Sequence, residues 1–319
     1  MNKTVGDAQK NIDVSIVMIN YNTFDLTKEA IESIFEHTSD LSYEIILIDN
    51  LSPDGSGERL REHFGDEIVY LQAGGNLGTA KSFNKGVDLS HGKYILWLNT
   101  DILLFDNAIF TLFDYMENHP ECGICGGNLI DFDKKPMHSF AVLPTLKSVK
   151  KPFSVLHILR NKSKKPFSDE YNFSGSPMEV GYITGADMMV RKSVIDDIGG
   201  FDEDIFMYAE ETEFTFRMKK NTDFTVMSVP AATIQHLEGA SFGKKSGFNE
   251  WRFSTYLNGM CVYFKKCYGA DAVKKYLNTL KRSYRKMAFI FKLRGRAEVS
   301  SDYKQSHDIV VKKIEEEKL

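Results

Sequence analysis

Carboxylate and amide side chains follow four apolar segments of the chain, each at the point where the segment ends. Such side chains can hydrogen-bond the base and ribose of a nucleotide, while a carboxylate can share a divalent metal ion with the diphosphate. For one isolated residue such as Asp101, a cap on the following helix is the simpler interpretation. Four such endings together favour a ligand site. They are Asn20-Tyr21-Asn22, Asp49-Asn50, Gly75-Asn76 and Asn99-Thr100-Asp101.

The apolar segments alternate with amphipathic ones, which predicts alternating β-strands and α-helices. This alternation indicates an α/β fold with a mostly parallel sheet flanked by helices. Because ligands bind at the carboxyl ends of parallel strands, the four polar endings should converge at one edge of the sheet. The expected strands are 14–22, 43–50, 68–76 and 93–101, and the expected helices are 25–38, 52–65 and 78–90, the first capped by Asp25.

Composition and motifs exclude several classes of protein. The 319 residues are 42% hydrophobic and 26% charged, as in an ordinary globular protein. The polar start MNKTVGDAQKNID does not predict a signal peptide, and no apolar run reaches the roughly 18 residues of a membrane span. The turn NYNTFDLT lacks the GxGxxG dinucleotide fingerprint, and no GxxxxGK(S/T) phosphate loop occurs. The lone CxxC at Cys122 and Cys125 predicts reduced core thiols.

Charge is distributed unevenly along the chain. Fourteen Lys or Arg against two acids between Lys244 and Arg296 give this segment +12, which leaves −16 for the rest of a chain whose net charge is −4. Aromatic and basic residues alternate at helical spacing over 248–296, so this segment could lie on an anionic membrane, pack on the sheet domain or mediate oligomers. Charge alone also permits nucleic-acid binding, but no known module accompanies it, and nucleic acid is not an expected partner.

Seven motifs resemble, in order and spacing, those of the family 2 glycosyltransferases with the GT-A fold. The resemblance is greatest to rhamnosyltransferase-like and other bacterial polysaccharide enzymes, and it extends over about residues 13–245. It implies a Rossmann-like, mostly parallel sheet flanked by helices, followed by a helical, basic extension at 246–319. The motifs are SIVMINYN, EIILIDNLSPDGS, GGNLGTAKSFNKG, YILWLNTD, GYITGADMMVRKSVIDDIGGFDE, YAEETEFTFRM and IQHLEGASF.

The resemblance also implies a division of the catalytic domain at 13–245. A nucleotide-sugar-binding half would occupy 13–130, and an acceptor-binding half would occupy 131–245. An insertion at 134–178 either helps to bind the acceptor or is a solvated loop. Residues 1–12 are expected to be flexible or disordered.

The implied nucleotide site gathers the strand endings. Asp49 would accept a hydrogen bond from the imide N–H of uracil or thymine, although an Asx-turn with Asn50 and Ser52 would also explain it. Gly78 could simply permit a tight turn. The implied nucleotide-binding residues are Asn20, Tyr21, Asn22, Asp49, Asn76, Gly78, Asn84, Asn99, Thr100 and Asp101.

The implied metal site departs from the family pattern. Asn99 stands where the family carries the first acid of its Asp-x-Asp motif, so Asp101 is the one charged ligand from NTD. His236 matches a histidine that binds the metal in relatives, although a lone His after a strand can also be structural. An imidazole suits Mn²⁺ better than Mg²⁺, and either ion is an expected cofactor.

The segment AEETEFTFR resembles the family motif that carries the catalytic base. Glu211 occupies the position of the base, with Glu210 in reserve, although acids at a helix start are also favoured by the helix dipole. Glu213 and Arg217 are expected to form an ion pair. Gly185, Ala186 and Asp187 are expected to contact the acceptor.

These assignments predict an inverting, metal-dependent transfer from a UDP- or dTDP-sugar, including dTDP-rhamnose, to a glycan or polyprenyl-linked acceptor. The enzyme would be cytoplasmic, either free or attached peripherally to the inner face of the plasma membrane, and oligomers remain an option. Two alternatives are a degenerate protein that binds nucleotide-sugars without turnover and a nucleotidyltransferase. The second would need a Gly-rich, basic loop after the first strand, which NYNTFDLT does not supply.

Overall fold

The computed structural model describes residues 12–153, 170–237 and 247–318. The expected flexibility of residues 1–12 therefore lies, except for Ile12, outside the described residues, as does part of the insertion at 134–178. The first elements are β1 (Val14–Asn20), α1 (Phe24–His37), β2 (Tyr43–Asp49), α2 (Ser56–Phe64), η1 (Gly65–Glu67), β3 (Val69–Gln72), α3 (Gly78–Asp88) and β4 (Tyr94–Leu98).

Four parallel strands form the first half of the sheet, in the order β3-β2-β1-β4. The central runs are continuously apolar and buried, as strands covered on both faces must be. Asn20 pairs with Asp49, and Val17 pairs with Trp97, so β1, β2 and β4 end at the same edge. The predicted convergence of their polar endings is confirmed. The prediction that Asp25 caps α1 is wrong, because Thr23 occupies the N-cap position and Asp25 lies in the first turn.

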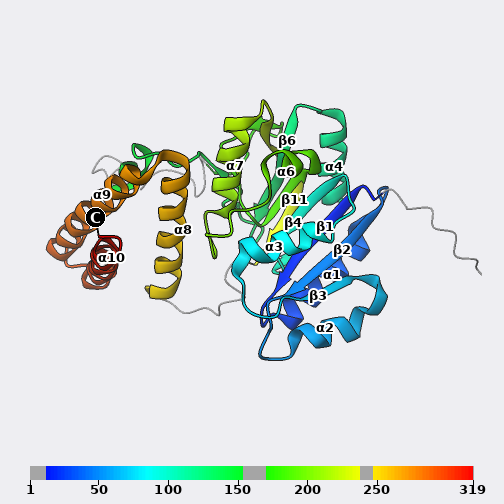
Figure 1. Ribbon diagram of the computed structural model, residues 1–319, viewed down its shortest axis with the longest axis horizontal. Helices are drawn as coiled ribbons and strands as arrows, with labels where there is room; N and C mark the ends of the chain where they lie inside the picture. Colours follow the sequence, from blue (N-terminus) through cyan, green and yellow to red (C-terminus); the bar gives the residue numbers. More distant parts are fainter. Residues whose placement is uncertain (1–11, 154–169, 238–246, 319) are drawn as a thin grey trace, which may run out of the picture.

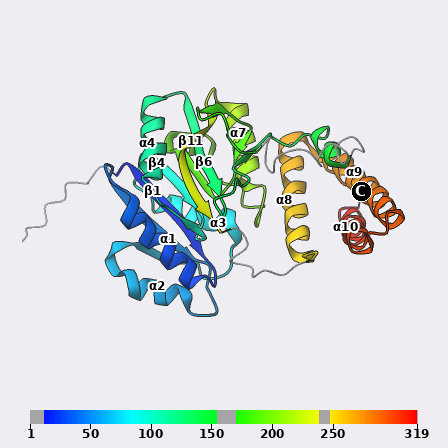
Figure 2. The same cartoon turned by 180° about the vertical axis from the view of Figure 1, so that it is seen from behind.

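Alternate strand side chains enter two hydrophobic cores, one on each face of the sheet. Ile16 and Leu96 pack with residues of α1, α2 and α4 (Ala108–Asn118). Val17 and Trp97 pack with α3, α6 (Lys192–Ile198) and α7 (Glu210–Asn221) on the opposite face. Figures 1 and 2 view the two faces in turn, with α3 nearer in the first and α1 nearer in the second.

The second half of the sheet is mixed in direction. β10 lies antiparallel between β4 and β6, β6 is parallel to β11, and β5 and β8 are antiparallel to β11. The sheet is therefore parallel in the half that the strand endings predicted and mixed beyond it. These strands are β5 (Ile102–Leu103), β6 (Cys122–Ile130), β8 (Met178–Glu179), β10 (Asp187–Arg191) and β11 (Thr225–His236); β7 (Phe140–Ala141) and β9 (Tyr182–Ile183) form a separate pair.

Three helices follow the sheet: α8 (Glu250–Tyr268), α9 (Ala270–Leu293) and α10 (Ala297–Glu316). They share a third core, to which the short helix η2 (Ser148–Phe153) contributes. In Figures 1 and 2, α8 lies beside the sheet domain and α9 and α10 lie farther out. The expected helical extension is confirmed. Within the described residues, no helix is both long and apolar enough to cross a membrane.

Candidate active site

Asp49 is held rigidly at the end of β2. Its Oδ1 accepts hydrogen bonds from Asn20 Nδ2 (2.7 Å) and Ser52 Oγ (2.6 Å), and its Oδ2 accepts one from Ser52 N (3.1 Å). A Cβ on Gly57 would collide with this carboxylate, and Asp49 is 1% exposed. The turn through Ser52 that was the alternative interpretation is therefore present. A direct bond from Asp49 to a base stays a prediction.

Tyr21 and Asn22 lie in the turn beside this carboxylate. Asn22 has a left-handed backbone (φ 58°), and its N–H donates to Ser52 Oγ at 3.0 Å. Tyr21 is 42% exposed. Its ring is thus accessible at the edge where β1 and β2 end, as a stacking role would require.

Gly78 and Asn84 of α3 contact the loop that precedes α7, and Asn76 lies just before α3. Asn76 Oδ1 accepts a hydrogen bond from Gly78 N at 3.2 Å. Position 78 requires glycine, because its φ is +78° and a Cβ there would collide with the Phe206 carbonyl. Asn84 Nδ2 donates to Phe201 O at 2.9 Å, while its Oδ1 accepts from Phe201 N at 2.8 Å. Asn84 therefore anchors this loop, a role that the sequence did not predict.

Asp101, in the turn just before β5, lies close to His236 at the end of β11. His236 Nε2 lies 3.2 Å from Asp101 Oδ1 and 3.4 Å from Asn99 Nδ2. Their placement follows from the pairing of His236 with Ile102 and from a hydrogen bond between Leu237 N and Asp101 O of 2.7 Å. The next helix begins at Ala108 with Asn107 at its N-cap position, so Asp101 does not cap it. The two side chains that were expected to bind a metal therefore lie together, and their binding of a metal stays a prediction.

One carboxylate and one imidazole make a small donor set for a metal ion. Among the described residues, no three His, Cys, Asp or Glu side chains gather closely enough to hold one. Mn²⁺ accepts both oxygen and imidazole nitrogen, and a diphosphate would supply further oxygen ligands. The two residues therefore fit a metal held jointly by the protein and its ligand.

The segment from Tyr182 to Asp187 follows the edge of the sheet. Asn99 N donates to Ala186 O at 3.0 Å, which places the small residues beside the Asp101 strand end. A Cβ on Gly185 would meet open space. Asp187 is fully buried, and its Oδ2 accepts from Gly127 N at 2.7 Å. Any contact with an acceptor here falls to Gly185 rather than to the expected Asp187, because that carboxyl lies inside the sheet.

Asp187 should make stability depend on pH. Its Oδ1 has no hydrogen-bond partner within residues 12–153, 170–237 and 247–318, and burial raises its pKa from 3.8 to about 7. The folded state then binds this proton more tightly than the unfolded chain. The free energy of unfolding therefore falls as pH rises from 3.8 to about 7. We expect wild type to lose about 3 kcal/mol more than Asp187→Asn between pH 5 and pH 8.

Urea unfolding of both proteins at pH 5 and pH 8 measures this difference. The other titrating groups are the same in both proteins, so their contributions cancel. Parallel pH profiles for the two proteins would show that Asp187 keeps an ordinary pKa.

Glu210 and Glu211 open α7 after two residues with left-handed backbones, Tyr208 (φ 66°) and Ala209 (φ 77°). Glu210 is 6% exposed, and its Oε2 meets no donor in the described part of the chain. Burial, and to a smaller extent the charge of Glu211, raises the pKa of Glu210 well above its ordinary value.

Glu211 is only partly buried. Burial also raises its pKa, against backbone N–H groups and the Thr212 hydroxyl, which lower it. Glu211 is therefore the more accessible of two carboxyls suited to accept a proton.

The turn before Glu210 is supported by α8. A Cβ on Gly259 would collide with the Tyr208 carbonyl, so α8 packs directly against this turn. Lys266 Nζ lies 3.0 Å from Asp202 Oδ2 and 2.8 Å from Asp204 Oδ2. The expected ion pair between Arg217 and Glu213 is present at 2.9 Å. The C-terminal helices thus help to position the glutamates, which the local sequence pattern did not indicate.

The segment from Tyr182 to Ala186 lies between the glutamates and the strand end before Asp101. Burial raises the pKa of Tyr182, and the nearby charge of Glu211 raises it further, so the phenol and carboxylate are within electrostatic reach. Ala186 lies four residues farther on and bonds to Asn99. Four extended residues span at most about 14 Å. This short segment therefore runs from the neighbourhood of Glu211 to the strand end before Asp101, and a common site for these side chains stays a prediction.

Comparisons with known proteins identify the family of the chain. The family described as Glycosyl transferase family 2 matches residues 15–199. An N-acetylglucosaminyl-diphospho-decaprenol L-rhamnosyltransferase of Mycobacterium tuberculosis is 26% identical over 219 residues, covering 63% of this chain and 68% of that protein. A low-salt glycan biosynthesis hexosyltransferase of Haloferax volcanii is 26% identical over 214 residues, covering 65% of this chain and 62% of that protein. An uncharacterized glycosyltransferase of Methanocaldococcus jannaschii is 30% identical over 166 residues, covering 48% and 55%.

Among solved structures, a crystal structure of GalNAc-T7 with UDP, GalNAc and Mn²⁺ superimposes with a TM-score of 0.56 at 14% identity. The match covers 82% of this chain but only 50% of that one. At this identity the likeness concerns the fold alone, which is of the GT-A type. Since the family match covers more than half of the 319 residues, the chain belongs to glycosyl transferase family 2.

Proposed function

We propose that this glycosyltransferase moves a sugar, with inversion, from a UDP- or dTDP-linked donor to a hydroxyl of a glycan or polyprenyl-linked acceptor. The observation that carries the proposal is the meeting of Asp101 and His236 at 3.2 Å, with Glu211 at the other end of the Tyr182–Ala186 segment. The rhamnosyltransferase of M. tuberculosis, whose name specifies a diphospho-decaprenol acceptor, supports the lipid-linked option. We place the reaction in bacterial cell-surface polysaccharide synthesis.

Each residue would have a distinct task. Asp101 and His236 would hold Mn²⁺ or Mg²⁺, which supplies positive charge against the diphosphate. Tyr21 would contact the base, and Asp49 would either bond to it or shape the turn that does. Glu211 would take the proton of the acceptor hydroxyl. The hydroxyl oxygen then bonds to the anomeric carbon, and the bond to the nucleoside diphosphate breaks on the opposite face.

A protein of the same fold that binds nucleotide-sugars without turnover is the second candidate. Two observations favour this candidate. Asn99 stands where the family has an acid, next to Asp101 and His236, and Glu211 stands where the family usually has Asp as the base. The side chain of Glu reaches farther than that of Asp, so the loop packed on α8 must place it correctly. Turnover of the donor separates the two candidates.

A panel of nucleoside diphosphates tests the donor assignment. We expect UDP or dTDP with Mn²⁺ to raise the melting temperature, because a ligand at 100 times its Kd stabilises the folded state by about 2.7 kcal/mol. CDP and GDP should have little effect, and chelation of Mn²⁺ should reduce the effect of UDP or dTDP. Thermal unfolding followed with each nucleotide, with and without Mn²⁺, measures this. Stabilisation by CDP or GDP alone would contradict the proposed role of Asp49.

Attachment to the inner face of the plasma membrane is part of the same proposal. A polyprenyl-linked acceptor is presented at a membrane surface, so an enzyme acting on it gains from a peripheral contact there. The basic segment 248–296 is the proposed place of contact, and its structure allows the contact to be specified further.

A further inference from the structure

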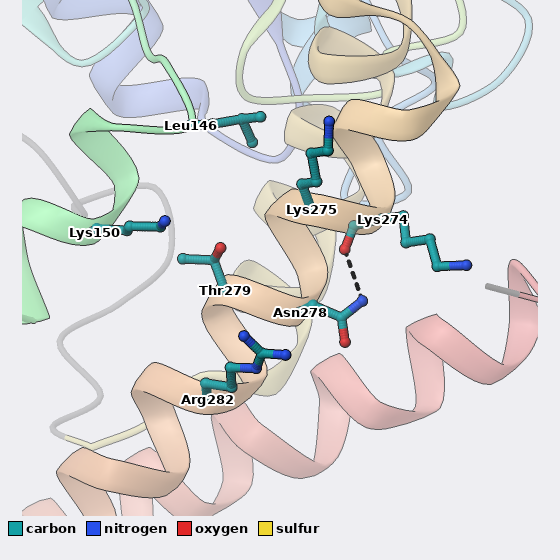
Figure 3. A pocket seen from close by; sticks show the side chains of 7 residues that line it. All are labelled: Leu146, Lys150, Lys274, Lys275, Asn278, Thr279 and Arg282. Carbon is teal, nitrogen blue, oxygen red and sulfur yellow. Dashed lines mark hydrogen bonds between the residues drawn. The ribbon is translucent and has the colours of Figure 1, made fainter.

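A basic pocket lies between η2 and α9, away from the candidate active site. Its volume is about 460 Å³. Figure 3 shows Lys150 extending from η2 on one side and the side chains of α9 on the other. Asn278, which lies among them, donates from Nδ2 to Lys274 O at 2.9 Å. The polar lining consists of Lys150, Lys274, Lys275, Asn278, Thr279 and Arg282, with four cations and no acid.

The pocket continues into a basic face of α9. The opposite face of this helix, which includes Leu277 and Leu280, is buried in the core shared with α8 and α10. On the exposed face, Lys and Arg residues recur at helical spacing. None of them forms an ion pair with an acid within the described residues. The cations of this face are Lys274, Lys275, Arg282, Arg285, Lys286 and Lys292.

Two large apolar side chains stand among these cations. Phe289 is 63% exposed and Leu293 is 72% exposed, both in the last two turns of α9. Leaving them in water is unfavourable, because transfer of a large apolar side chain from water to an apolar environment is favourable. Phosphate contacts with nucleic acid would use the cations but would give no reason for exposed aliphatic and aromatic groups. An anionic bilayer accommodates both, with cations at the headgroups and apolar side chains below them.

We propose that the exposed face of α9 docks on an anionic membrane surface and that the basic pocket receives the phosphate of a lipid headgroup. The proposal deepens the proposed function, because a lipid-linked acceptor would be presented at that surface. Its test does not depend on catalysis. A protein that binds vesicles but transfers no sugar would refute the proposed function and leave this inference intact.

Sedimentation with vesicles tests the proposal. We expect binding to phosphatidylcholine vesicles that contain about 30 mol% phosphatidylglycerol and little binding to pure phosphatidylcholine. Each cation near an anionic surface contributes about 1 kcal/mol, or about fivefold in affinity. Lys275→Gln/Arg282→Gln should therefore weaken vesicle binding about 25-fold. Phe289→Ser/Leu293→Ser should also weaken it, without a change in melting temperature, because both side chains are exposed.

A matched control removes two cations from the neighbouring helix. Lys304 and Lys312 are exposed on α10 outside the pocket. Lys304→Gln/Lys312→Gln has the same net charge as the pocket variant, and we expect its vesicle binding to stay within about threefold of wild type. Equal losses in the two double variants would overturn the proposal in favour of nonspecific attraction. So would equal binding to neutral and anionic vesicles, or binding of DNA or inorganic phosphate without binding of vesicles.

Discussion

Replacing Glu211 with Gln is expected to lower kcat by about 10²–10⁴-fold, the usual loss when a general base is removed. The amide keeps the size of the side chain at the start of α7 but cannot accept the acceptor's proton. Donor affinity should change less than twofold, because Asp101 and His236 lie at the other end of the Tyr182–Ala186 segment. Initial rates of nucleoside diphosphate release, with a separate titration of donor binding, measure both quantities.

The pH profile provides a second test of Glu211. Burial raises the pKa of this carboxyl, and a base must be ionised to act, so activity should fall as pH drops through a pKa above the ordinary Glu value of about 4.3. Glu211→Gln should lack this acidic limb. An unchanged limb in the variant would assign the titration to another group.

Glu210→Gln is the matched control. The Glu210 carboxyl is buried, and this burial raises its pKa well above the ordinary Glu value, so its neutral form is favoured and resembles the amide that replaces it. We expect kcat to change less than about threefold. If Glu210→Gln were inactive while Glu211→Gln kept its activity, the base would be Glu210.

The elements that could be predicted from sequence are those encoded by local patterns. The strands ending at Asn20, Asp49 and Leu98 contain apolar runs, which are typical of parallel strands buried on both faces of a sheet. Asp101 and His236 are 135 residues apart in sequence, yet the family motifs around each predicted their meeting, and β5 and β11 bring it about. The family motifs thus predicted a long-range contact that local hydrophobic periodicity does not predict.

The residues whose role was missed act through contacts between distant segments. Asn84 bonds to Phe201 across 117 residues, and Gly259 packs against Tyr208 from a helix outside the family match. Neither contact follows a period of two or 3.6 residues. Asp187 was expected to face an acceptor because it follows the small residues Gly185 and Ala186 in the motif GYITGADMMV. β10 instead lies between β4 and β6, so its side chain is enclosed in the sheet.

Asp101→Asn and Asn99→Asp should change metal dependence in opposite directions. Asp101→Asn removes the carboxylate that lies 3.2 Å from His236, so charge on the departing diphosphate is poorly compensated. We expect kcat/KM to fall by about 10²–10³-fold and the Mn²⁺ concentration for half-maximal activity to rise. Asn99→Asp adds a carboxylate where Asn99 Nδ2 now lies 3.4 Å from His236 Nε2. It should tighten Mn²⁺ binding by about tenfold, equivalent to about 1.4 kcal/mol.

The pair of variants separates metal binding from general damage to the strand end. Both substitutions exchange Asp and Asn, which have the same shape, within NTD, so a merely structural effect would reduce activity in both. Opposite shifts in Mn²⁺ titrations, read by activity and by calorimetry at one fixed pH, require that the carboxylates bind the ion. The pH is fixed because protons compete with the metal for imidazole and carboxylate alike. Identical Mn²⁺ titrations in wild type and Asp101→Asn would place the metal elsewhere and leave Asp101 as a partner of His236 alone.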